Sequence, residues 1–117
     1  MEKATEIYDE ILEFLSENDD FLLTTHLSAD GDAYGSVLAM AYLLDRWGKK
    51  YEIIIHDREK EEKYNYLWGW KNIRVFHEDY KRSYQAAVVL DVPSQSRIGD
   101  PATLLPLPEK CLKIELC

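Results

Sequence analysis

Residues 22–36 read LLTTHLSADGDAYGS, and this stretch decides the expected fold. It opens with a short apolar run that is typical of a buried strand, and it closes with small residues that lead into a helix. Between them stand one histidine and two aspartates, His26, Asp30 and Asp32. Gly31 allows the backbone to turn tightly between the two acids. Because open α/β folds bind ligands where their strands end, the stretch predicts a strand, a functional loop and a helix.

The rest of the chain continues the alternation of strand and helix. Apolar or β-branched runs at 21–25, 51–55 and 86–90 predict strands, and the amphipathic pattern of 4–17 predicts a helix. The other expected elements are a helix over 33–47, a charged helix over 59–68, an edge strand at 73–76, a helical turn at 102–105 and a final strand at 111–116. This order predicts one α/β domain built on a doubly wound, mostly parallel sheet with helices on both faces.

The composition is acidic, with 14 basic and 22 acidic residues among 117 and a net charge of −8. Proteins that bind duplex DNA carry a basic stripe, so we expect no duplex DNA binding. A phosphorylated substrate is compatible with this charge, because bound divalent cations reverse the local field. The sequence shows neither a signal peptide nor an apolar run long enough to span a membrane. Since Cys111 and Cys117 match no metal or redox spacing, we expect reduced thiols and a cytoplasmic protein without a membrane partner.

A fourth ligand candidate, Asp91, ends the apolar run at 86–90. The carboxyl ends of parallel strands share one edge of a sheet, so Asp91 is expected beside His26, Asp30 and Asp32. One imidazole and three carboxylates suit Mn²⁺, Mg²⁺, Fe²⁺ or Zn²⁺. Two such ions about 3.5–4 Å apart are the usual clamp for phosphoester hydrolysis. The pattern therefore indicates a divalent metal site.

The same residues also fit ordinary turn chemistry. In that interpretation Asp32 caps the helix that begins near Ala33, and His26 is a strand-end histidine with a satisfied hydrogen bond. Asp91 then only starts an Asx turn. Residue types and spacing alone leave both interpretations open.

Three further residues lie on or near the same expected edge. Arg97 is either a bidentate phosphate contact or a surface arginine. His56 and Asp57 follow the strand at 51–55, where they either support the ligands or belong to an exposed polar loop. The sequence favours the loop.

Two segments together resemble the DHH phosphoesterase family. They are HLSADGDAYGS at 26–36 and VVLDVPSQSRIG at 88–99. The resemblance is closest to the oligoribonucleases (nanoRNases) that also remove the 3′-phosphate of phosphoadenosine phosphate. It implies a Rossmann-like domain and a two-metal phosphoesterase, dependent on Mn²⁺ or Mg²⁺, that hydrolyses short oligonucleotides or small nucleotide phosphates.

The resemblance also implies roles for individual residues. His26, Asp30 and Asp32 correspond to the first metal motif of the family, and Asp91 corresponds to the acid that bridges two Mn²⁺ ions. Asp32 and Asp91 are then the catalytic acids, with Arg97 as a substrate-binding residue.

The sequence departs from the family after the last expected strand. Where the family carries Asp-His-His, this chain reads Glu115-Leu116-Cys117. We therefore expect residues 1–117 to be the N-terminal part of a DHH domain, without the C-terminal substrate-binding domain and incomplete as a catalyst. The alternative is a catalytically inactive metal-binding, nucleotide-binding or interaction module. An exposed apolar edge beside 111–116 further predicts self-association into a homo-oligomer.

Overall fold

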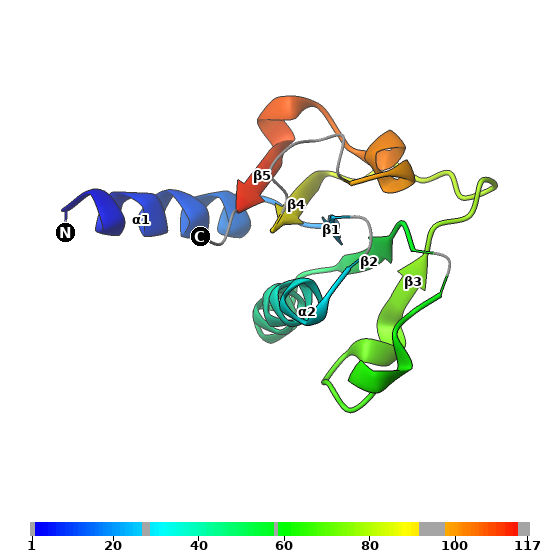
Figure 1. Cartoon of the computed structure of the whole chain (residues 1–117). Coiled ribbons are helices and arrows are strands. Elements are labelled where there is room, and N and C mark those ends of the chain that lie inside the picture. Colours follow the sequence, from blue (N-terminus) through cyan, green and yellow to red (C-terminus); the bar gives the residue numbers. More distant parts are fainter. Residues whose placement is uncertain (1, 27–28, 58, 92–97, 115–117) are drawn as a thin grey trace.

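Five parallel strands form one sheet in the order β3-β2-β1-β4-β5 (Figure 1). The computed structural model describes residues 2–26, 29–57, 59–91 and 98–114. The strands are β1 (Phe21–Thr25), β2 (Tyr51–Ile55), β3 (Ile73–Val75), β4 (Ala86–Leu90) and β5 (Cys111–Ile114). The helices are α1 (Glu2–Glu17), α2 (Gly31–Arg46) and the short 3₁₀ turns η1 (Glu62–Tyr64), η2 (Trp70–Asn72), η4 (Asp100–Leu104) and η5 (Pro108–Lys110). The predicted doubly wound α/β sheet is confirmed.

The chain winds from β1 outward in both directions, so the switch point of the topology lies between β1 and β4. β2 and β3 extend the sheet on one side, and β4 and β5 extend it on the other. Ligands of open α/β sheets bind outside the carboxyl ends of the strands at this point. The residues that follow β1 and β4 therefore hold the functional position of the fold.

Two apolar layers enclose the sheet, and they differ in what covers them. On one face α1 and α2 pack on the strands through a core that includes Leu15, Val37 and Leu44. On the other face Tyr84 and Leu104 cover Leu22, Ile54 and Ala87. Among the described residues both α-helices lie on the first face, and the second face carries the 3₁₀ turn η4. Every residue of β1 and β4 is buried, which explains their continuous apolar sequence.

The predicted charged helix over 59–68 is wrong. This segment contains only the 3₁₀ turn η1, followed by Gly69 in a left-handed conformation (φ +81°). Tertiary contacts override helical propensity here, because the hydroxyl of Tyr34 accepts a hydrogen bond from the Glu61 N–H at 2.8 Å. The rings of Tyr64 and Trp68 pack against Tyr34 and Tyr42, at centroid distances of 5.1 Å in both pairs.

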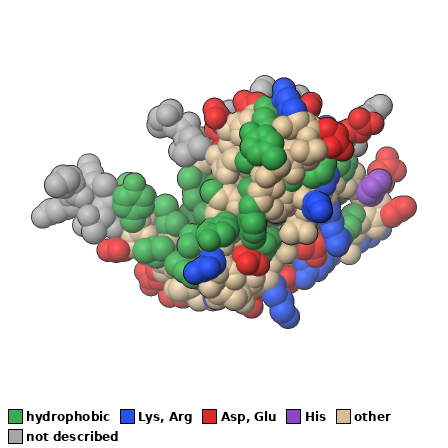
Figure 2. Space-filling view, turned by 90° about the horizontal axis from the view of Figure 1, so that it is seen from below, with side chains coloured by type: hydrophobic (Ala, Val, Ile, Leu, Met, Phe, Trp, Pro, Cys, Tyr) green, Lys and Arg blue, Asp and Glu red, His purple; other side chains and the backbone are tan. Residues whose placement is uncertain are grey.

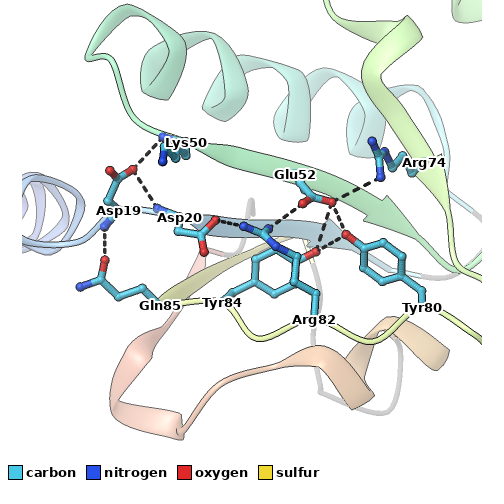
Figure 3. Close-up of polar contacts among 9 residues, drawn as sticks. All are labelled: Asp19, Asp20, Lys50, Glu52, Arg74, Tyr80, Arg82, Tyr84 and Gln85. Carbon is cyan, nitrogen blue, oxygen red and sulfur yellow. Dashed lines mark hydrogen bonds and ion pairs between the residues drawn. The ribbon is translucent and has the colours of Figure 1, made fainter.

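A polar cluster ties the amino ends of β1 and β2 to the segment before β4 (Figure 3). Glu52 accepts hydrogen bonds from Tyr80 and from Arg82, whose Nη1 lies 2.6 Å from Oε1. Arg82 also pairs with Asp20, and the hydroxyls of Tyr80 and Tyr84 lie 2.8 Å apart. The cluster joins β1, β2 and the segment before β4, so we assign it a structural role.

Apolar side chains also remain on the surface. Figure 2 shows hydrophobic side chains along α1 and on the adjoining body, and Ile7, Tyr8 and Leu12 of α1 are exposed. No helix among the described residues is long and apolar enough to cross a membrane. Cys111 is a free thiol, and burial raises its pKa. Cys117 lies outside the described residues.

Candidate metal centre

The last pair of residues in β1 and β4 brings the two functional strand ends together. Thr25 and Leu90 are register partners, and the buried hydroxyl of Thr25 donates to the Leu90 carbonyl at 2.7 Å. His26 and Asp91 are the next residues of the two strands. Their proximity therefore follows from the pairing of β1 with β4, and Thr25 adds a side-chain bond where the backbone ladder ends.

Three of the four predicted ligands converge. His26 Nε2 lies 3.6 Å from Asp91 Oδ2 and 3.8 Å from Asp30 Oδ1. One ligand atom from each of the three side chains lies within 4.8 Å of the other two. His26 and Asp91 are half-buried and Asp30 is exposed, so the group opens to solvent.

Asp30 has a second role as the N-cap of α2. Its Oδ1 accepts a hydrogen bond from the Ala33 N–H at 2.9 Å, and its backbone is extended, as N-cap residues require. The interpretation that Asp32 caps the helix is therefore wrong, because α2 begins at Gly31, two residues earlier than expected. The negative charges of Asp30 and Asp32 both favour the positive end of the helix dipole.

Asp32 lies beside the group of three. It is exposed in the first turn of α2 and lines a hollow of about 610 Å³ together with Ser36, Leu90 and Ile114. This hollow lies on the α2 face of the sheet, where β4 and β5 end. The structure thus brings together His26, Asp30 and Asp91, and it places Asp32 at the border of the neighbouring hollow.

Asp91 holds a backbone conformation that most residues avoid. Its φ is +57°, in the left-handed region, where aspartate and asparagine are tolerated better than other non-glycine residues. Its N–H donates to the Ile114 carbonyl at 2.8 Å, so β5 helps to hold the turn. Strained residues of this kind cluster at functional sites.

The loop that carries the ligands is braced from outside. The Asp57 carboxylate accepts a hydrogen bond from the Ala29 N–H at 2.9 Å. The Tyr64 ring packs over Gly31, where a Cβ would lie 3.0 Å from the hydroxyl oxygen. The spacing of residues in the sequence predicted neither contact. The expectation that Asp57 belongs to an exposed polar loop is wrong, because its carboxylate binds the Ala29 N–H. The available signal was the position of Asp57, two residues after Ile55 at the end of β2, on the edge that also carries the ligands.

Arg97, the predicted substrate contact, lies outside the described residues. The segment that follows is anchored by His56, whose Nδ1 accepts a hydrogen bond from the Asp100 N–H at 3.1 Å. Gly99 (φ +81°) approaches the same ring so closely that a Cβ would lie 2.5 Å from it. His56 is therefore also a bracing residue and not part of a free loop.

The donor set and its spacing fit a divalent cation. Ligands about 2.1 Å from a shared ion lie roughly 3 Å apart at adjacent positions and roughly 4.2 Å apart at opposite ones. The two distances from His26, 3.6 and 3.8 Å, fall between these values. Mixed imidazole and carboxylate sites take Mn²⁺, Mg²⁺, Fe²⁺ or Zn²⁺.

Comparison with known proteins adds one observation about the fold. Neither a family model nor a curated protein sequence matches the chain. A solved structure does match. It is the crystal structure of an exopolyphosphatase-related protein from Bacteroides fragilis, with a TM-score of 0.77 and 21% sequence identity. The match covers 92% of this chain and 33% of that protein, so this chain spans about a third of its length. At this identity the likeness supports the shared α/β fold alone.

Proposed function

We propose that the chain is a metal-binding domain of a phosphoesterase. In this proposal His26, Asp30 and Asp91 hold Mn²⁺ or Mg²⁺, and Asp32 joins Asp91 in holding a second ion. The substrate is a short oligonucleotide or a small nucleotide phosphate. The observation that carries the proposal is the convergence of one imidazole and two carboxylates at the switch point of the sheet.

Electrostatics supports a metal-dependent reaction. A phosphate that approaches Asp30, Asp32 and Asp91 on a protein of net charge −8 is repelled unless cations lie between them. When bound, such ions polarise a phosphoryl oxygen and lower the pKa of bound water so that hydroxide forms near neutral pH.

Each residue of the site has its own role in the proposed reaction. Asp91, held in its strained turn by β5, contributes a carboxylate from the second strand end. Asp30 contributes its carboxylate while it caps α2, and His26 contributes a neutral nitrogen. Asp32 borders the 610 Å³ hollow, which we assign to the substrate. Arg97 is proposed to contact the phosphate.

The family resemblance in residues 26–36 and 88–99 supports the substrate class. The neighbouring structure is described as exopolyphosphatase-related, so a phosphoanhydride chain is also worth testing. A second candidate function is a metal-binding or nucleotide-binding module without turnover. It is favoured by Glu115-Leu116-Cys117, which stand where the resembling family carries Asp-His-His.

A hydrolysis assay separates these functions. The purified chain is incubated with Mn²⁺ and, in separate reactions, a diribonucleotide, phosphoadenosine phosphate and polyphosphate, and released products are quantified. If the chain hydrolyses phosphoesters, at least one nucleotide substrate releases product, and this release requires Mn²⁺ and is lost in Asp91→Asn. Mn²⁺ binding without turnover selects the binding module, and product release that persists in Asp91→Asn contradicts the site.

A further inference from the structure

We propose that Asp57 is a positioning residue of the metal centre, which it orders through the backbone of the loop between β1 and α2. This inference rests on the proposed function. Asp57 follows β2 and contributes no atom to the described group of His26, Asp30 and Asp91. It therefore acts through the loop.

The contact lies between the ligands in sequence. The Asp57 Oδ2 accepts the Ala29 N–H at 2.9 Å, and Ala29 stands between His26 and Asp30. Ala29 is 8% exposed, so few water molecules reach its N–H to replace this partner. A carboxylate acceptor makes the bond charge-assisted, which strengthens it compared with a neutral one. Losing a partner for a buried N–H leaves that group unsatisfied.

The neighbouring residue supplies a matched comparison. His56 precedes Asp57 and also accepts one backbone N–H, that of Asp100, at 3.1 Å. The two residues thus brace different segments from the same strand end. Of these two described bonds, the one from Asp57 holds the segment between His26 and Asp30, so the two residues are expected to differ in their effect on metal affinity.

The geometry also predicts what each substitution at position 57 does. Asparagine keeps an oxygen that accepts the Ala29 N–H and removes the charge. Alanine removes the acceptor. Groups that orient metal ligands from outside typically change metal affinity by about 10–100-fold when they are removed. If Asp57 orients the ligands through the Ala29 N–H, Asp57→Asn keeps the Mn²⁺ affinity and Asp57→Ala loses it.

Two measurements on the full chain test the proposal. Calorimetric titration with Mn²⁺ is expected to show about 10–100-fold weaker binding for Asp57→Ala. Asp57→Asn and His56→Ala are expected to stay within about threefold of the unmodified protein, well short of the loss for removing an orienting group. Amide hydrogen exchange without metal is expected to be faster at Ala29 in Asp57→Ala, and to be accelerated far less in Asp57→Asn, which keeps an acceptor oxygen.

The outcomes separate this proposal from the proposed function. The positioning role is overturned if Asp57→Ala leaves the exchange rate of the Ala29 amide unchanged. It is also overturned if Asp57→Asn binds Mn²⁺ as weakly as Asp57→Ala does. An equal loss of affinity in His56→Ala also overturns it. If the unmodified protein binds no Mn²⁺, the proposed function fails. The Ala29 exchange rates then still decide whether Asp57 holds the loop.

Discussion

His26 Nε2 and Asp91 Oδ2 lie 3.6 Å apart at the carboxyl ends of two adjacent parallel strands. Neither side chain is near the other in sequence, and the pairing of Thr25 with Leu90 accounts for the approach. The site therefore depends on the register of β1 against β4. A one-residue slip would place His26 on the opposite side of the strand from Asp91.

The two threonines of β1 are expected to respond in opposite ways to replacement by valine. Thr25 donates to Leu90, whereas the buried hydroxyl of Thr24 has no hydrogen-bond partner among the described residues. Thr25→Val should lower the free energy of unfolding by about 1–2 kcal/mol, because the Leu90 carbonyl loses its donor. Thr24→Val should leave it unchanged or raise it by about 1 kcal/mol, because an unpaired hydroxyl leaves the core. Urea unfolding measures the free energy of unfolding of both variants. An equal loss of stability in the two would contradict the hydrogen bond from Thr25 to Leu90.

Substitutions at Asp30 should separate helix capping from metal binding. Asp30→Ala removes the cap and the carboxylate, and it is expected to lower the free energy of unfolding by about 1 kcal/mol. Asp30→Asn keeps a capping oxygen, so stability should change by only a few tenths of a kcal/mol. Both variants should bind Mn²⁺ more weakly. Asp30→Asn with full Mn²⁺ affinity would remove Asp30 from the ligand set.

The tyrosines of the amino-end cluster should make stability fall at high pH. Burial raises the pKa of Tyr84 and of Tyr80 above the usual value of about 10. Above pH 10 the unfolded chain loses these protons while the folded protein keeps them. Each tyrosine then lowers the free energy of unfolding by up to about 1.4 kcal/mol for each further pH unit.

Urea unfolding between pH 9 and about 11.5 measures this effect, since the usual tyrosine pKa of about 10 lies inside that range. Tyr84→Phe should flatten the decline relative to the unmodified protein. Tyr66, which is 76% exposed, supplies the control variant Tyr66→Phe, whose decline should match that of the unmodified protein. An unchanged decline in Tyr84→Phe would show that Tyr84 does not contribute.

Self-association through β5 is expected at high concentration. β5 is an edge strand of the sheet, with Cys111, Leu112 and Ile114 only partly buried. The unpaired backbone edge of such a strand can pair with another chain, and Lys113 is the one exposed residue of β5 that opposes this with a charge. Sedimentation velocity should therefore show a fraction of dimer that increases with protein concentration. A single monomeric species across the whole concentration range would refute this prediction.

The strands were predictable because burial on both faces produces continuous apolar runs. The runs at 21–25, 51–55 and 86–90 match β1, β2 and β4, and the edge position of β3 is confirmed. The prediction of a helix over 59–68 was wrong because the aromatic residues of this segment pack against α2. Local helix propensity does not reveal such tertiary contacts.

The site was predictable in its members and less so in its detailed geometry. Parallel strand ends bring His26 and Asp91 to one edge, which topology alone implies. Asp30 and Asp32 flank the first residue of α2, so composition could not decide which of them caps it. The sequence places Asp57 at the same edge, but its contact depends on the path of the loop around Ala29.

The most direct test of the central claim is the Mn²⁺ affinity of Asp91→Asn. Asparagine tolerates the left-handed conformation of Asp91 and removes only the charge. Asp20→Asn is the matched control, since Asp20 has a similar φ of +55° and stands before β1, at the other end of the strand. By calorimetry we predict Mn²⁺ binding to the unmodified protein and to Asp20→Asn, with at least a tenfold loss in Asp91→Asn, about 1.4 kcal/mol. Equal affinity in all three proteins would contradict a metal centre at His26, Asp30 and Asp91.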